Sequence, residues 1–106
     1  MKKILGLWLL SVAACGGGSS VASCDQQGTG DNNYCQEYQA TAELLAPYKA
    51  ACTKGTYADA PCSRPNAVGG CRTTTMGITV TNWFYFGTKA QLMSACASSS
   101  STFVEQ

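Results

Sequence analysis

The sequence contains no histidine and few charged residues, and its apolar runs are short. Histidine is the commonest general base and metal ligand in proteins, so its absence removes the most frequent routes to acid–base catalysis and zinc binding. Motifs of the Gly-x-Ser-x-Gly, P-loop and dinucleotide-binding types are absent as well. These absences argue against an enzyme, and we expect a non-enzymatic protein without a metal or cofactor.

The first 14 residues have the three parts of an export signal in the usual order. Lys2 and Lys3 form a basic start, the apolar run 4–10 follows, and small residues then lead to Cys15. The apolar run is shorter than the roughly 20 residues that a membrane-spanning helix requires. We therefore expect residues 1–14 to be removed as a signal peptide.

The segment Val12-Ala13-Ala14-Cys15 resembles the lipobox of bacterial lipoproteins, in which an aliphatic and two small residues precede a cysteine. The resemblance implies that the Cys15 thiol carries diacylglycerol and that its new amino group receives a further acyl chain such as palmitate. Gly16 follows in place of an aspartate, which implies the outer membrane of a Gram-negative bacterium. Two or three acyl chains anchor a protein stably, at about 0.8 kcal/mol per buried methylene. A plain secretory signal with a free Cys15 thiol is the alternative.

Charge gives no support for a charged partner. Without Lys2 and Lys3, five basic side chains stand against six acidic ones, and the basic ones form no cluster. Nucleic-acid binding requires a basic patch, and steering of acidic substrates requires a strong field of one sign. We therefore expect no nucleic-acid partner.

Cysteine is abundant, with seven among 106 residues. Once Cys15 is assigned to lipid, an even set of six remains, which in a small exported domain indicates three disulfides. Zinc binding and redox chemistry are weaker alternatives, because the sequence contains no Cys-x-x-Cys pair.

The composition of the chain changes near residue 30. Residues 15–30 are rich in Gly, Ser, Gln and Asp and predict a flexible tether, followed by one small domain over 31–106. An apolar stripe at steps of three or four residues predicts a helix over 33–53, with N-cap candidates from Asp31 onward. Pro47 should kink or break this helix.

The rest of the domain predicts strands and one further helix. Two alternating segments around Met76-Gly77 indicate a hairpin, and a capping box of Thr88 and Gln91 begins the helix. The expected elements are strands over 56–59, 68–75, 78–86 and 102–104 and a helix over 89–97. We expect a disulfide-stapled α+β fold, with a three- to four-stranded antiparallel sheet and two helices on one face.

Segments 51–59 and 95–105 resemble each other, since each contains a helix end with a cysteine, a small polar turn and a threonine–aromatic pair. Chance is one explanation of this similarity; if the similarity is real, it predicts that the chain twice forms a helix leading into a strand. In an antiparallel meander both helices would end at the same edge of the sheet. The disulfides predicted on that basis are Cys52–Cys96, Cys62–Cys71 and Cys24–Cys35.

Several short patterns of the mature chain occur in the same order in a known group of proteins. They are Cys52-x-x-Gly-Thr-Tyr57, Pro61-Cys62, Val68-Gly69-Gly70-Cys71, Gly77-Ile78-Thr79 and the aromatic strand that precedes Cys96. In this respect the chain resembles small cysteine-containing predicted lipoproteins of myxobacteria. The resemblance implies a fold and an envelope location, and no activity.

One surface of the domain is a candidate for binding. Alternation along 78–86 places Trp83 and Tyr85 on one side of their strand, and Arg72 lies on the neighbouring strand. If the helices leave that side open, the three residues form a platform for sugar rings or a partner protein. The alternative is that both aromatic residues complete a thin core.

These features predict a lipoprotein of the cell envelope with a binding or structural role. Its expected partners are the lipid bilayer, reached through Cys15, and an envelope protein or glycan. The alternative is an inhibitor-like lipoprotein that presents the loop between Cys62 and Cys71 to an enzyme. Glu37 and Glu43 face different directions on the predicted helix and make a poor carboxylate pair for glycoside hydrolysis.

Overall fold

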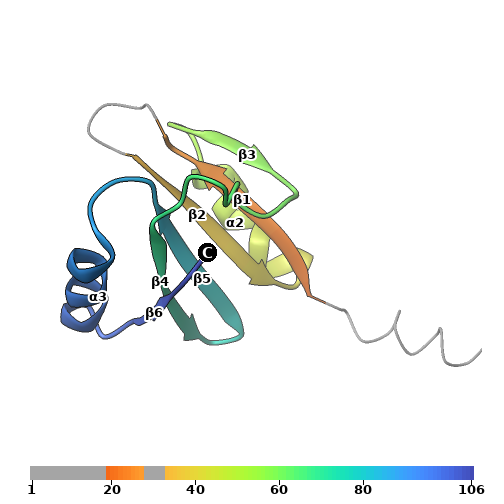
Figure 1. Cartoon of the computed structure of the whole chain (residues 1–106). Coiled ribbons are helices and arrows are strands. Elements are labelled where there is room, and N and C mark those ends of the chain that lie inside the picture. Colours follow the sequence, from red (N-terminus) through yellow and green to blue (C-terminus); the bar gives the residue numbers. More distant parts are fainter. Residues whose placement is uncertain (1–18, 28–32) are drawn as a thin grey trace, which may run out of the picture.

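The computed structural model describes residues 19–27 and 33–106, which form an α+β domain (Figure 1). One antiparallel sheet has the strand order β3-β1-β2-β5-β4-β6. Cys15 and the N-cap candidates Asp31 and Asn32 lie outside the described residues. In chain order the elements are β1 (Ser20–Asp25), β2 (Tyr34–Ala40), α2 (Ala42–Ala51), β3 (Thr56–Ala58), β4 (Gly69–Thr75), β5 (Ile78–Phe84), α3 (Lys89–Ser98) and β6 (Thr102–Val104).

The order strand–strand–helix–strand occurs twice. We call residues 20–58 the N-terminal motif and residues 69–104 the C-terminal motif. The two motifs meet where β2 pairs with β5, and β3 and β6 lie at the two outer edges of the sheet (Figure 1). The prediction that the chain twice forms a helix leading into a strand is confirmed, and the repeat extends to the two strands before each helix.

A row of directly paired residues crosses the sheet and relates the two motifs. Gln36 pairs with Asn82 at its centre, next to Cys24 on one side and Cys71 on the other. Residues that face each other in a sheet point to the same side, so both cysteines of this row, the cysteine row, lie on one face. Cys24 bonds Cys52 at the end of α2, and Cys71 bonds a cysteine of α3.

Each motif buries its own helix through a leucine. In the N-terminal motif, Leu45 of α2 packs on Ala22 and Tyr38, and the Tyr48 ring lies 4.6 Å from the Tyr38 ring, centroid to centroid. In the C-terminal motif, the buried residues of α3 are Leu92 and the disulfide-bonded Cys96. A second cluster lies on the opposite face and consists of Cys35, Cys62, Ala67 and Trp83.

The α+β class, the antiparallel sheet and the two helices are confirmed, whereas three to four strands were too few. Residues 20–25, predicted as tether, form β1, in which Cys24 is buried. Small residues made this segment resemble a linker in composition. Residues 34–40, predicted as helix, form β2. The four-residue spacing of Tyr34 and Tyr38 fits one face of a strand as well as one face of a helix.

The helices begin where threonine caps them. Thr41 caps α2, and Thr88 caps α3 with the predicted capping box to Gln91. Pro47 lies inside α2 and does not end it. It is exposed, as is Glu43, whose carbonyl loses the hydrogen bond that the proline nitrogen cannot donate. Water can satisfy a carbonyl at such a position.

Three disulfides are present, and the predicted pairing of the cysteines is wrong. The bonds are Cys24–Cys52, Cys35–Cys62 and Cys71–Cys96, in place of Cys52–Cys96, Cys62–Cys71 and Cys24–Cys35. The error came from the assumed meander. In the actual strand order α2 packs on β1 and β2 while α3 packs on β4 and β6, so the two helices are too far apart to be joined.

Candidate binding face

The face opposite the cysteine row is built from three further rows of paired residues. The first row contains the paired residues Cys35 and Trp83. The second contains Glu37, Thr81 and Arg72, and the third contains Gln39, Thr79 and Thr74. The alternation predicted for β5 is confirmed, because Thr79, Thr81 and Trp83 share this face. The residues that join β3 to β4 cover the first row and leave the third open.

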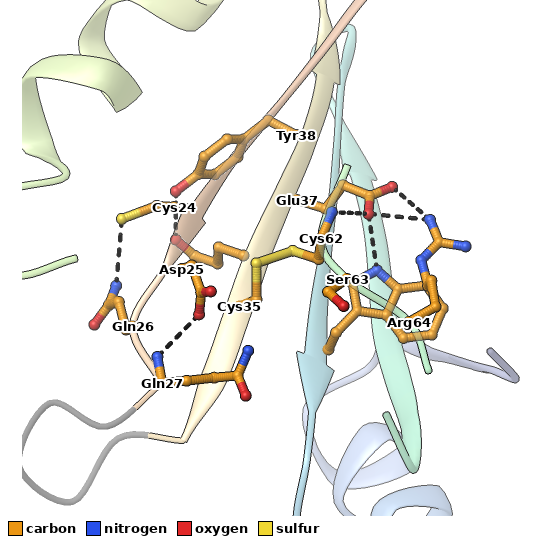
Figure 2. The surroundings of a disulfide bond; sticks show 12 residues. Cys24, Asp25, Gln26, Gln27, Cys35, Glu37, Tyr38, Cys62, Ser63 and Arg64 are labelled. Atoms are coloured by element: carbon orange, nitrogen blue, oxygen red, sulfur yellow. Dashed lines mark hydrogen bonds and ion pairs between the residues drawn. A yellow bond between two sulfur atoms is a disulfide. The ribbon is translucent and has the colours of Figure 1, made fainter. Parts of the chain in front are cut away.

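The Cys35–Cys62 disulfide holds this connecting segment against the sheet, and Glu37 fixes it beside the bond (Figure 2). Glu37 Oε1 accepts hydrogen bonds from the Cys62 backbone N–H at 3.0 Å, from Arg64 Nη2 at 3.0 Å and from Trp83 Nε1 at 3.1 Å. Arg64 Nη2 also lies 3.0 Å from Glu37 Oε2. One carboxylate thus accepts from a backbone N–H, from Nη2 of a guanidinium and from an indole N–H, so it fixes the segment at three points.

Trp83 is covered by this segment and is only 1% exposed. The Arg64 guanidinium carbon lies 4.3 Å from the centroid of its ring, a cation–π geometry. The expectation of an exposed Trp83 platform is therefore wrong, and the residue completes a core. Tyr85 is half-buried, and its hydroxyl donates to the Ser63 carbonyl. Burial raises the pKa of Tyr85.

Beyond the covered part lies an open strip of polar side chains, which we call the polar strip. Its members are Gln39, Arg72, Thr74, Thr79 and Thr81, of which Thr81 is buried. Arg72 Nε donates to Thr81 Oγ1 at 3.0 Å, and the hydroxyl oxygens of Thr74 and Thr79 lie 2.9 Å apart. Gln39, Arg72 and Thr74 are exposed. The hydrogen bond from Arg72 Nε to Thr81 therefore orients the Arg72 side chain on the polar strip.

The positive charge of Arg72 has no counter-charge on the polar strip. Within residues 19–27 and 33–106, the two ion pairs are Arg64–Glu37 and Lys89–Glu105, and neither involves Arg72. Glu37 also borders the strip, but its carboxylate is occupied by three donors of its own. The Nη1 and Nη2 groups of Arg72 make no hydrogen bond to any described residue. A guanidinium held by Nε with both ends free is suited to bind a carboxylate or phosphate through two parallel hydrogen bonds.

Apart from the polar strip, a groove lies between α2, β1 and β3 and has a volume of about 250 Å³. Apolar side chains, including Leu45 and Tyr57, form much of its wall, with Lys49 and Asp59 as its charged residues. The Lys49 ammonium lies 5.8 Å from the centroid of the Tyr57 ring. This groove combines an apolar wall with charges of both signs.

Of the three residues predicted as a ligand face, only Arg72 lies on an open surface. Trp83 and Tyr85 share its side of the sheet but contact the segment that covers it. Sequence reasoning missed the roles of Glu37 and Arg64, because their contact joins residues 27 positions apart. Thr79 and Thr81, which alternate along β5, were the signal that could have identified the polar strip.

The described residues contain no group of three or more His, Cys, Asp or Glu side chains placed to hold a metal ion. None of their helices has the length and apolar character needed to cross a bilayer. Comparison with family models, curated proteins and solved structures finds no match to this chain.

Proposed function

We propose that this protein is a lipid-anchored component of a bacterial cell envelope, attached through Cys15, with a non-enzymatic binding role. The pairing of cysteines supports the anchor. All six cysteines of the described residues are used in three disulfides, so Cys15 is left over for a different purpose, as the lipobox resemblance implies. Three disulfides also favour an oxidising compartment outside the cytoplasm.

The open end of Arg72 is the observation that carries the binding role. We place both helices on the face of the cysteine row, since each is bonded to that row, and assign the opposite face to the ligand. There the free Nη groups of Arg72 stand among hydroxyl and amide groups that both donate and accept hydrogen bonds. Such a surface matches a hydroxyl-rich ligand with an acidic group, and we propose an acidic glycan of the envelope.

The arrangement of Glu37 supports a role without catalysis. A carboxylate that acts as an acid or base needs access to substrate and a suitable partner group. Glu37 instead accepts three hydrogen bonds from its own chain. The polar strip itself offers threonine hydroxyls, and Glu37, the carboxylate that borders it, is the one held by these three donors.

The anchor and the binding role are tested separately. Mass spectrometry of the mature protein should find acyl chains on Cys15, and the Cys15→Ala variant should move from the membrane to the soluble fraction. The lipidated chain on beads should retain acidic glycan from envelope extracts. Arg72→Gln should lower that retention tenfold or more, as expected for the loss of a charge-assisted hydrogen-bonded pair of about 1.5–3 kcal/mol.

Lys54→Gln is the matched control, since it removes one exposed positive charge away from the polar strip. Equal loss of glycan in the Arg72 and Lys54 variants would reduce the interaction to general charge attraction. Capture of an enzyme that depends on Ser63 and Pro65, with no glycan retained, would instead support the inhibitor-like alternative.

A further inference from the structure

One end of the sheet combines the start of β1 with the tip of the β4–β5 hairpin. Strands β1 and β5 both run antiparallel to β2, so Ser20 and Ile78, their first residues, lie at the same end (Figure 1). The hairpin turn at Met76 and Gly77 extends beyond Ile78. It therefore projects past the level of Ser20, the first residue of β1.

The residue at this tip is unusual for its position. Met76 has a φ of +50° and is 88% exposed, so a large apolar side chain stands in water on a left-handed backbone. Tight hairpin turns of this kind favour Asn, Asp or Gly at such a position. Met76 gains no burial that would offset the strain and the exposure. An outlier with no structural benefit points to a function outside the folded domain.

Further apolar residues surround the tip. A Cβ atom at Gly77 would lie 3.8 Å from Leu44 Cδ1, so the first turn of α2 reaches the hairpin. Leu44 is 39% exposed, and Ile78 is half-buried. Glu43 is the acidic residue in this turn of α2. We call Leu44, Met76 and Ile78 the apolar tip.

We propose that the apolar tip contacts the lipid bilayer in which Cys15 is anchored. This inference rests on the proposed lipidation of Cys15. Four residues lie between Cys15 and Ser20, and the five residue steps from one to the other span at most about 18 Å when fully extended. Met76 lies one residue past Thr75, which pairs with Ile78, so the backbone of the turn reaches about 3 Å past the level of Ser20. The same end of the domain is thus held close to the membrane and carries its most exposed apolar side chain.

Such a contact fixes the orientation of the domain. A tether alone would let the domain rotate relative to the membrane. A second, weak apolar contact with the bilayer interface holds the strands roughly perpendicular to the membrane plane. The polar strip then stands along the side of the domain, and the end of the sheet opposite the apolar tip points away from the membrane.

Tryptophan fluorescence in brominated lipid tests this orientation. The lipidated full mature chain is reconstituted into vesicles of phosphatidylcholine brominated near the glycerol end of its acyl chains, which quench a tryptophan that enters the interface. We compare Met76→Trp with Met93→Trp, since Met93 is 50% exposed on α3 beside β4 and β6. Trp83 is buried and gives a common background.

The inference predicts that Met76→Trp is quenched about three times more strongly than Met93→Trp, as expected for a side chain inserted about 5–10 Å into the interface. Leu44→Trp serves as a second reporter and should follow Met76→Trp. Equal quenching of the Met76 and Met93 variants, or stronger quenching at Met93, would overturn the apolar tip as a membrane contact.

The two proposals fail in different ways. If mass spectrometry finds no acyl chain on Cys15, the proposed lipid anchor is wrong. Quenching of the same tryptophan variants, measured with vesicles added to the unlipidated chain, then still tests whether the apolar tip contacts lipid. If Cys15 is lipidated but Met76→Trp is not quenched, the anchor stands and the apolar tip is wrong. Circular dichroism of each variant verifies that the fold is retained.

Discussion

The N-terminal and C-terminal motifs share one framework. They differ at the positions that form the face of the sheet opposite the cysteine row. Each has a cysteine in its first strand, a threonine cap, a buried leucine in its helix and an aromatic residue in its last strand. Around the central Gln36–Asn82 pair, however, Cys35 and Glu37 in β2 correspond to Thr81 and Trp83 in β5.

Glu37 and Trp83, which occupy equivalent positions, form a hydrogen bond with each other. The shared features therefore stabilise the scaffold, and the differences hold the segment between the motifs. Cys35 has a disulfide partner in that segment, whereas the equivalent Thr81 accepts a hydrogen bond from Arg72 on the open side. This asymmetry divides one face of the sheet into a covered part and a polar strip.

Removal of the Cys35–Cys62 disulfide, which has no counterpart in the C-terminal motif, should have the largest effect on stability. Cys35→Ala with Cys62→Ala opens a loop with a sequence separation of 27, for which chain entropy alone predicts a loss of about 3.5 kcal/mol. Release of the segment also exposes Trp83, so we expect a total loss of about 4–5 kcal/mol in the free energy of unfolding. Denaturant titration measures it, and a red shift of Trp83 fluorescence reports the uncovering. An unchanged emission spectrum would contradict the covering role of the segment.

The two equivalent disulfides allow a direct comparison of the motifs. Their sequence separations of 28 and 25 predict chain-entropy terms that differ by only about 0.1 kcal/mol. We nevertheless expect a larger loss for the Cys71–Cys96 pair, by about 1 kcal/mol, because α3 has one other buried residue while α2 also packs Tyr48 on Tyr38. Hydrogen exchange should show faster opening of α3 after its double Cys→Ala change than of α2 after the equivalent change. Equal losses would show that the helices are held equally well.

Local signals in the second half of the chain were sufficient to predict its elements. The hairpin at Met76-Gly77, the capping box at Thr88 and the strand 102–104 were all found from short patterns. The first half was harder. Residues 34–40 have a spacing that fits both strand and helix, and β1 has small residues that resemble a linker. Only their pairing with other strands decides between the alternatives.

The candidate site depends on contacts that sequence does not encode locally. Arg72 was found because it lies on a regular strand beside alternating residues. Glu37 was assigned to a helix, so its contacts with Cys62, Arg64 and Trp83 were missed. The disulfide pairing failed for the same reason, since it follows from strand order, and strand order depends on recognising β1 and β2.

The helix caps should give a smaller difference between the motifs. Thr41 Oγ1 accepts from the Leu44 N–H at 3.4 Å, whereas Thr88 Oγ1 accepts from the Gln91 N–H at 3.1 Å and Gln91 Oε1 accepts from the Thr88 N–H at 2.9 Å. Replacing a threonine cap by alanine costs about 1 kcal/mol. We expect Thr88→Ala to lower the free energy of unfolding more than Thr41→Ala, because it also frees the Gln91 side chain. A larger loss for Thr41→Ala in thermal unfolding would reverse this order.

The last difference appears only in alkaline solution, where Tyr38 differs from Phe84, its equivalent in the C-terminal motif. Burial, with a smaller contribution from neighbouring tyrosines, raises the pKa of Tyr38 from 10.0 to about 12. Its neutral hydroxyl donates to Gln36 Oε1 at 2.7 Å. An unfolded chain releases this proton near its ordinary pKa, so stability is unaffected below pH 10 and decreases between about pH 10 and 12. Tyr38→Phe should therefore lose less stability than the wild type over this range, and parallel curves of unfolding free energy against pH would contradict the assignment.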